Sequence, residues 1–391
     1  MNQEVYQEIR QEMSDQLNNL ERVGQLMQKI MAEEAKTYLE KIEASLEFFA
    51  QRMIFSFRND DAEIQKLWDV FLDKLQGWEK INDIYENDEY KTFIEKYFWD
   101  INQFLQEIIN KSDNVPKNND RMGLVLIAKN EGRYLPEWIE YHKAVGINRF
   151  FIYDNESTDN TKEVLDQYID EGCVTYTWCP GKLRQLTAYE DALDRFRFEV
   201  KYLGVIDTDE FILPVQGGTV PVTVDKLFHM YPKAGSIAVG WRIFGSDGQV
   251  TDNGKPVIGT FLHRADNSFW QHQHIKSICD PRKTLWPISP HHFVYTDDFC
   301  TINERGGRVN GPYDKSGEEQ ECNYLQINHY YVKSREYWIK VKMKKGFADC
   351  TGNYLDDFFA MNDRNEVEDV RMLKYLPTVE QNLRMRGLLN E

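Results

Sequence analysis

From residue 123 onward, short apolar runs alternate with longer stretches in which apolar positions recur with a helical period. The apolar runs are typical of buried strands, and the periodic stretches are typical of amphipathic helices. The predicted strands are residues 123–128, 149–153, 173–178 and 202–207, and the predicted helices are residues 135–145, 160–171 and 185–200. Because helical crossovers join successive strands, we predict a mostly parallel, doubly wound α/β sheet with helices on both faces.

Local residues mark the ends of these helices. Pro136 suits the first turn of a helix, and Gly146 and Gly172 suit the position just after a helix ends. The hydroxyl of Ser157 or Thr158 is expected to cap the helix at residues 160–171.

The first part of the chain has a different pattern. Up to residue 115 the apolar positions keep a helical period, with no proline and with glycine only at Gly24 and Gly77. We therefore predict an all-helical domain at residues 1–115, a bundle or partly a coiled coil, suited to dimerisation or partner docking. We predict a polar linker at residues 116–121, the α/β domain at residues 122–345, and a C-terminal helical segment at residues 346–391 that packs on it.

Polar residues follow the predicted strands at the point where each strand ends. They include Asn130–Glu131, Asp154–Asn155, and Asp207 with Asp209. Ligands of open α/β sheets bind at the carboxyl edge of the strands, so we expect these groups to meet in one crevice. Along a strand Asp207 and Asp209 would face the same way, and such a pair suits a hard divalent cation. The alternative to a metal site is a solvated acidic turn after the strand. The first strand is not followed by a G-x-G-x-x-G pattern, which disfavours a dinucleotide-binding fold.

Composition narrows the function classes. The formal charge of −17 argues against nucleic acid as a general partner. No apolar run approaches the length of a transmembrane helix, and the N-terminus lacks the features of a signal peptide. The six cysteines show no C-x-x-C pair, which favours reduced thiols and a cytoplasmic protein.

Four segments resemble glycosyltransferases of the GT-A fold: LIAKNEGRYLPEWIEYHKAVGINRFFIYDNESTDNT (126–161), IDTDEF (206–211), WRIFGSDG (241–248) and INHYYVKSREYW (327–338). The first half resembles family 2, and the second half is closer to family 92 and the related bacterial family 2-like group. The resemblance covers roughly residues 122–377 and leaves out the helical N-terminus.

The resemblance implies a metal-dependent, inverting glycosyltransferase that moves a sugar from a UDP-sugar to a glycan or a lipid- or protein-linked saccharide. It implies Mn²⁺ or Mg²⁺ held by Asp207, Asp209 and His329, although His329 alone would read as a structural histidine. The donor-binding residues that it implies are Asn130, Glu131, Asp154, Arg184, Gln185, Tyr189, Asp207, Lys333 and Ser334, with Lys276 as a further candidate. Galactosyltransferases of family 92 make UDP-galactose the first donor to test.

An inverting transferase needs a general base for the acceptor hydroxyl. The candidates are Asp247, His292, Asp297 and Asp298, and the sequence leaves the choice among them open. Trp241 and Phe244 suit either an acceptor-binding floor or the core. The adjacent His291 and His292 could form half of a zinc site, but further ligands at standard spacing are missing.

Two other interpretations of the function remain open, and the C-terminal lysines raise a separate question about membrane contact. Asp207 in VIDTDEF could be the nucleophile of a haloacid-dehalogenase-like phosphatase, although three strand–helix units precede it. Alternatively, the chain could be a non-catalytic scaffold that acts through its N-terminal helices. The lysines at positions 340, 342, 344 and 345 favour a solvated helix face over peripheral contact with anionic lipid.

Overall fold

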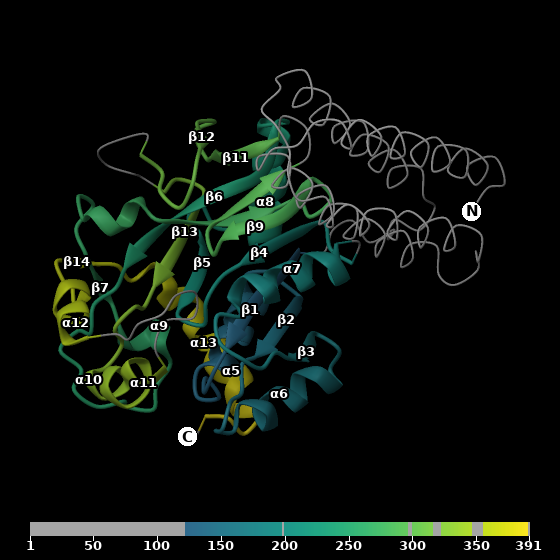
Figure 1. Ribbon diagram of the computed structural model, residues 1–391. Helices are drawn as coiled ribbons and strands as arrows, with labels where there is room; N and C mark the ends of the chain where they lie inside the picture. Colours follow the sequence, from purple (N-terminus) through teal and green to yellow (C-terminus); the bar gives the residue numbers. More distant parts are fainter. Residues whose placement is uncertain (1–121, 198, 296–298, 316–321, 346–354, 390–391) are drawn as a thin grey trace, which may run out of the picture. The chain divides into compact units, whose positions relative to one another are not determined.

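The computed structural model describes residues 122–197, 199–295, 299–315, 322–345 and 355–389 (Figure 1). The predicted helical domain and linker, residues 1–121, lie outside the described residues, as do the candidate bases Asp297 and Asp298. Within the described residues a large mixed sheet lies between helices, so the class is α/β as predicted.

The first half of this region confirms the predicted alternation of strands and helices. Its elements are β1 (Met122–Ala128), α5 (Leu135–Ala144), β2 (Arg149–Asp154), α6 (Thr161–Asp170), β3 (Val174–Trp178), α7 (Gln185–Phe196) and β4 (Tyr202–Val205). These strands lie in the order β3-β2-β1-β4, and each neighbouring pair is parallel. The positive φ of Gly146 (94°) and Gly172 (79°) follows the ends of α5 and α6, as the sequence predicts.

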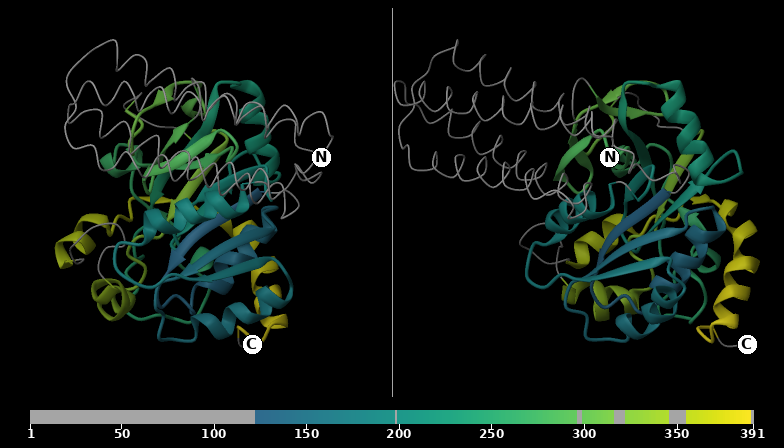
Figure 2. Two further views of the ribbon diagram at one scale, coloured as in Figure 1. Left: turned by 45° about the vertical axis from the view of Figure 1, so that its right-hand side comes forward. Right: turned by 90° about the vertical axis from the view of Figure 1, so that its right-hand side faces the viewer.

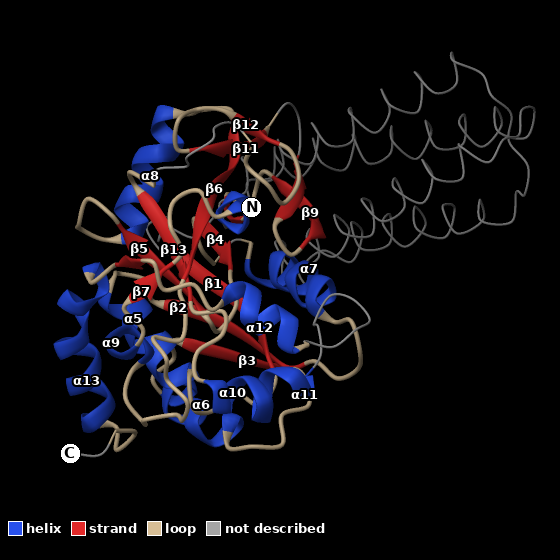
Figure 3. Ribbon diagram, turned by 90° about the vertical axis from the view of Figure 1, so that its left-hand side faces the viewer, coloured by secondary structure: helices blue, strands red, loops and turns tan. Residues whose placement is uncertain are grey.

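Helices cover both faces of the parallel strands because successive strand residues point to opposite sides. Leu124 and Leu126 of β1 pack in one buried cluster with Trp138 of α5. Val125 packs in a second cluster with Leu193 of α7. Figure 3 shows α5 on one side of the strands and α7 on the other.

The second half of the sheet differs from the prediction of a mostly parallel sheet. It contains β5 (Glu210–Pro214), β6 (Ala234–Ile243), β8 (Ile275–Cys279), β11 (Cys300–Asn303), β12 (Arg308–Val309) and β13 (Leu325–His329), with α8 (Val220–Met230) between β5 and β6. β8 runs antiparallel to both β4 and β6, and β13 runs antiparallel to β5 but parallel to β6. These pairings join segments far apart in the chain, so local periodicity carries no signal of their direction.

Shorter elements complete the described region. Around the sheet lie α9 (Val257–Thr260), β7 (His263–Arg264), η2 (Trp270–Gln273), β9 (Thr284–Ser289), β10 (His292–Tyr295) and β14 (Val367–Glu368). The C-terminal part forms α10 (Arg335–Tyr337), the π-helix η3 (Trp338–Lys342), α11 (Met343–Lys345), α12 (Asp356–Asn362), η4 (Arg371–Tyr375) and α13 (Leu376–Met385). None of the helices in these ranges is long and apolar enough to cross a bilayer.

The C-terminal helix α13 packs on α5, so the C-terminal segment lies against the helical layer that covers the sheet. Val379 and Leu383 are buried in the main core cluster. Asn382 donates a hydrogen bond of 2.8 Å to Glu140 of α5, and Arg386 pairs with the same carboxylate at 2.6 Å. In the right-hand view of Figure 2, the yellow helix that leads toward the C-terminus is α13, at the edge of the described part.

Candidate functional site

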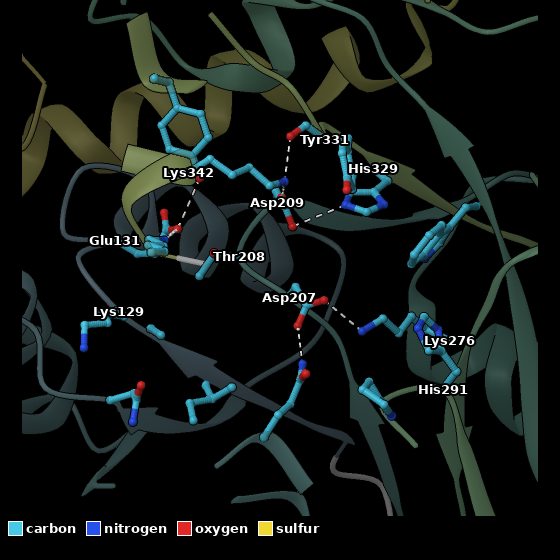
Figure 4. A pocket seen from close by; sticks show the side chains of 18 residues that line it. Lys129, Glu131, Asp207, Thr208, Asp209, Lys276, His291, His329, Tyr331 and Lys342 are labelled. Atoms are coloured by element: carbon cyan, nitrogen blue, oxygen red, sulfur yellow. Dashed lines mark hydrogen bonds and ion pairs between the residues drawn. The ribbon is translucent and has the colours of Figure 1, made fainter. Parts of the chain in front are cut away.

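A pocket of about 310 Å³ opens at the carboxyl ends of β1, β2 and β4. Its volume lies at the lower end of the range for small-molecule sites, about 300–1,000 Å³. It is lined by Ile127, Ala128, Lys129, Glu131, Asn155, Gln185, Asp207, Thr208, Asp209, Trp241, Lys276, Pro290, His291, His329, Tyr331, Tyr337, Lys342 and Lys345. Three of the predicted strand ends therefore meet here, through Glu131, Asn155 and the two aspartates (Figure 4).

Asp207 and Asp209 lie in the turn between β4 and β5, not on a strand as we expected. Trp138 of α5 pins this turn, because its indole N–H donates to the carbonyl oxygens of Asp207 (3.1 Å) and Glu210 (2.9 Å). Trp138 is fully buried, so the position of the turn depends on the packing of α5. Both aspartates still line the pocket, but each has its own cationic partner.

Asp207 is held by two donors from different elements. Gln185, the first residue of α7, donates to Oδ1 at 3.0 Å, and Lys276 of β8 donates to Oδ2 at 2.9 Å. The Asp207 side chain remains 34% exposed, so it is open to a ligand in the pocket.

Lys276 is buried between two carboxylates. Its ammonium lies 2.9 Å from Asp207 and 3.6 Å from Glu210. Burial would lower the pKa of Lys276, but these two carboxylates outweigh it and raise the pKa above its usual value. Burial raises the pKa of Glu210 to about 8, against the opposing charge of Lys276. The same oxygen of Glu210, Oε2, accepts the main-chain N–H of Asp207 at 2.8 Å, which fixes the turn from inside.

Asp209 pairs with Lys342 and His329. Lys342 of η3 donates to Oδ2 at 2.7 Å, and Nε2 of His329 lies 3.4 Å from Oδ1. Burial would raise the pKa of Asp209, but Lys342 and His329 outweigh it and hold the pKa well below its usual range. Asp209 is therefore a carboxylate at neutral pH.

Asp209 and His329 fit the protein half of a divalent metal site. In an octahedral shell with bonds of about 2.1 Å, neighbouring ligands lie about 3.0 Å apart. The separation of 3.4 Å between Oδ1 of Asp209 and Nε2 of His329 is close to that value. Within the described ranges no group of three or more His, Cys, Asp or Glu side chains is placed to hold a metal. A metal here would need further ligands from a bound molecule.

Glu131 and Asn155 form a further part of the pocket wall. The Glu131 carboxylate pairs with Lys345 of α11 and accepts the hydroxyl of Tyr337 at 3.3 Å. The side-chain amide of Asn155 donates to the carbonyl oxygens of Cys179 and Gly181, each at 2.7 Å. Glu131 thus links the segment after β1 to α10 and α11, and Asn155 links the segments after β2 and β3.

Three predicted donor-binding residues lie behind this wall, outside the pocket lining. Asn130, with φ of 54°, accepts the main-chain N–H of Thr158, and its own N–H donates to Ser157. Ser157 and Thr158 therefore form hydrogen bonds with Asn130 in the loop after β1. Neither caps α6, so the predicted helix cap is wrong. The buried carboxylate of Asp154 accepts the N–H of Ser157 and the hydroxyl of Tyr176, so it supports the loop. Lys333 lies between the rings of two tyrosines, at 4.1 and 4.2 Å from their centroids.

The remaining donor candidates also lie outside the lining. Arg184 donates to the carbonyl oxygen of Pro180. Tyr189 is fully buried and accepts a hydrogen bond of 3.0 Å from Gln185, so it supports a residue that reaches the pocket. Ser334 caps α10 by accepting the N–H of Tyr337 at 3.2 Å.

Of the two predicted acceptor-binding residues, Trp241 lies at the pocket and Phe244 lies in the core. Trp241 lines the pocket, but its ring stacks on His274 at 4.7 Å, so that face is occupied. Phe244 is fully buried and packs against Tyr330 at 4.8 Å, which makes it a core residue.

The two candidate bases within the described residues, Asp247 and His292, do not line the pocket. The Asp247 carboxylate accepts the main-chain N–H groups of Leu262 (2.6 Å) and His263 (3.2 Å), so it holds a loop. Nδ1 of His292 lies 3.2 Å from the hydroxyl of Thr301. Neither residue is among those that line the pocket, and this placement gives both a supporting role.

Sequence reasoning did not name His291, Lys342 or Lys345 as donor-binding, acceptor-binding or catalytic residues, although all three line the pocket. The prediction of a solvated lysine face holds for Lys340, whose side chain is 66% exposed, but is wrong for the buried Lys342. The spacing of 342 and 345 puts both lysines on one side of a helix, which was the available signal. Their targets, Asp209 and Glu131, come from distant segments, so the sequence could not show the pairing.

A second cavity of about 780 Å³ lies between the loop after Gly132 and α13. Leucines of α13 and the C-terminal residues form much of its wall. Its guanidinium groups are already paired, Arg133 with Asp252 and Arg384 with Glu380. The smaller pocket is the better candidate because carboxylates and lysines converge there.

The fold and the pocket define an α/β protein with an acidic, lysine-containing ligand site at the carboxyl edge of its sheet. The chain belongs to glycosyltransferase family 92, because the sequence profile of that family matches residues 128–346. This stretch contains every pocket-lining residue except Ile127.

Similar proteins include a family 92 protein of Ricinus communis, 26% identical over 249 residues, which cover 62% of this chain and 40% of that protein. A family 92 protein of Oryza sativa subsp. japonica is 32% identical over 130 residues, 33% of this chain and 22% of that protein. The chain therefore spans less than half the length of these curated relatives.

Among solved structures, Staphylococcus aureus TarS 1–349 in complex with UDP-GlcNAc is 10% identical, with a TM-score of 0.32, and the match covers 68% of this chain and 73% of that chain. Glucosyl-3-phosphoglycerate synthase from Mycobacterium tuberculosis in complex with Mn²⁺, UDP and glucosyl-3-phosphoglycerate is 17% identical, with a TM-score of 0.20. That match covers 31% of this chain and 44% of the synthase.

Proposed function

We propose that this chain is a metal-dependent, inverting glycosyltransferase that binds a UDP-sugar in the pocket at the carboxyl edge of the sheet. The observation that carries the proposal is the arrangement of Asp207 and Asp209 with Lys276 and Lys342, within a stretch that matches family 92. Two carboxylates beside two ammonium groups suit a ligand that brings both a divalent cation and a diphosphate. UDP-galactose is the first donor to test.

The donor nucleoside would lie against the ends of β1 and β2. Glu131 and Asn155 supply a carboxylate and an amide there, and Lys129 adds a cation. The Glu131 carboxylate and the amide oxygen of Asn155 can accept hydrogen bonds from ribose hydroxyls or the uracil N–H, and Lys129 can donate to a uracil carbonyl.

Lys342 and Lys345 would hold the diphosphate. When the bond between the sugar and the β-phosphate breaks, negative charge develops on the leaving UDP. Two ammonium groups at one wall of the pocket stabilise that charge without reorganisation, since η3 and α11 already place them there.

Mn²⁺ or Mg²⁺ would be held by Asp209 and His329, and the diphosphate would supply further ligands. When bound, the ion neutralises charge on the diphosphate and so assists departure of UDP. Asp207 keeps a different role, because its two oxygens accept hydrogen bonds from Gln185 and Lys276 and remain open on one side.

The phosphatase alternative is disfavoured by the same contacts. Gln185 and Lys276 each donate to one oxygen of Asp207, and these hydrogen bonds weaken a carboxylate as a nucleophile toward phosphorus. Membership of family 92 also opposes that reading.

Release of UDP from a panel of UDP-sugars, with Mn²⁺ and simple saccharide acceptors, tests the proposal. We expect one donor to be turned over by the wild type and by Asp247→Asn, and turnover by Asp209→Asn to fall by about 100-fold or more. Loss of all turnover on chelation of the metal is also expected. Release of phosphate without UDP, or equal turnover by Asp209→Asn, would contradict the proposal.

A further inference from the structure

His291 lines the pocket, and one nitrogen of its ring has no hydrogen-bond partner among the described residues. Its Nδ1 lies 2.6 Å from the carbonyl oxygen of Ile275. A carbonyl oxygen can only accept, so Nδ1 carries the proton and donates it. In the neutral imidazole Nε2 is then an acceptor, and it makes no hydrogen bond with the described residues.

The surroundings of His291 fix its backbone and its ring. Its carbonyl oxygen accepts the hydroxyl of Ser277 at 2.7 Å, and its main-chain N–H donates to Ser289 at 3.2 Å. The ring packs edge-to-face on Trp241 at 5.3 Å. Figure 4 shows His291 beside Lys276, across the pocket from Lys129. Such support is typical of a side chain that must act in one orientation.

The carboxylates in the pocket are already held by donors, and the other histidine of the pocket lining, His329, is assigned to the metal in the proposed function. Glu131 pairs with Lys345 and Asp209 pairs with Lys342, while Nε2 of His329 lies 3.4 Å from Asp209. Asp207 likewise accepts hydrogen bonds at both oxygens. Nε2 of His291 is therefore the best available acceptor on the wall opposite the nucleoside side.

We propose that His291 is the catalytic base that deprotonates the acceptor hydroxyl. This inference rests on the proposed function and adds the residue that its sugar-transfer step requires. The acceptor oxygen forms the new bond to C1 of the donor sugar while its proton passes to Nε2 of His291. The bond between C1 and the diphosphate oxygen breaks, its electron pair leaves with UDP, and the imidazolium later returns its proton to solvent.

Electrostatics support the neutral starting state of the base. Burial lowers the pKa of His291 well below its ordinary value, and the nearby Lys276 acts in the same direction, as do His274 and His329. A bound diphosphate would add negative charge to the pocket and raise that pKa toward the working range.

The test compares His291→Asn with His292→Asn in the full chain. Asparagine can keep the hydrogen bond to Ile275 through its amide, but it cannot accept the proton. His292 is the matched control, because it is the adjacent histidine and does not line the pocket. We expect kcat of His291→Asn to fall by about 10²–10⁴-fold, with KM for the donor and affinity for UDP unchanged. The His292→Asn control should keep its kcat.

Three outcomes decide the inference. Full sugar transfer by His291→Asn would overturn it. If this variant loses UDP affinity or thermal stability, His291→Ala with added imidazole replaces it: recovery of transfer by imidazole supports the inference, and no recovery overturns it. Failure of the proposed function is distinct, because the wild type would then turn over no UDP-sugar.

Discussion

Replacing Lys276 with methionine should destabilise the protein, because it leaves the partly exposed Asp207 and the buried Glu210 without their shared cation. Lys276 is 1% exposed and lies between Asp207 and Glu210. Removal of one partner of a buried ion pair costs about 3–5 kcal/mol. Since Asp207 is 34% exposed and partly screened by solvent, we expect about 3 kcal/mol at pH 7. That loss lowers the melting temperature by about 6–12 °C.

The deficit should grow as the pH rises. Burial raises the pKa of Glu210 to about 8, so this group contributes stability at low pH that is lost as the pH rises through about 8. Lys276 lowers that pKa, and without it the pKa rises further. Above about pH 8 the folded variant therefore keeps a proton that the folded wild type has released, and its stability falls faster by up to about 1.4 kcal/mol per pH unit.

Thermal unfolding followed by circular dichroism at pH 7 and pH 9 measures both effects. Lys340→Met is the matched control, since the same substitution at an exposed lysine should leave the melting temperature within about 2 °C. Adding Glu210→Gln to Lys276→Met should abolish the extra loss at pH 9. An unchanged melting temperature in Lys276→Met, or a deficit that shrinks at pH 9, would refute the reasoning.

Three further predictions separate site residues from structural ones. Lys342→Met should weaken UDP binding by about 10- to 100-fold, measured by calorimetry, because it removes a charged donor beside Asp209, whereas Lys340→Met should not. Phe244→Ala should lower the free energy of unfolding in urea by about 3–5 kcal/mol and leave the UDP affinity of the folded protein unchanged. Asp247→Ala should cost about 1–3 kcal/mol of stability, because two main-chain N–H groups lose their acceptor, and transfer by the folded protein should persist. A stable Asp247→Ala variant without transfer would instead make Asp247 the base.

The parallel half of the sheet could be predicted because each of its strands is a local apolar run. β1, expected at residues 123–128, spans Met122–Ala128, since both of its faces are buried under helices. The second half of the sheet, with its mixed strand directions, could not be predicted in the same way. β8 carries the buried Lys276, and β13 ends in the buried Asn328 and His329, so their patterns are not apolar. Their place depends on charges and partners supplied by other segments.

The candidate site was predictable to the same extent. Asp207 and Asp209 could be found because they directly follow a buried strand, and strand ends share one edge of the sheet. Lys342 could not, because its burial depends on Asp209, more than a hundred residues away in the chain. For His291 the sequence shows two adjacent histidines, and only tertiary packing decides which one faces the pocket.

The measurement that tests the central claim most directly is the affinity for UDP in the presence of Mn²⁺, determined by calorimetry. The account predicts that the wild type binds UDP, that chelation of the metal weakens binding, and that Asp209→Asn weakens it by about tenfold or more. The control variant Asp247→Asn should bind UDP as the wild type does. No binding of UDP by the wild type, or equal affinity in Asp209→Asn, would contradict the assignment of this pocket as the donor site.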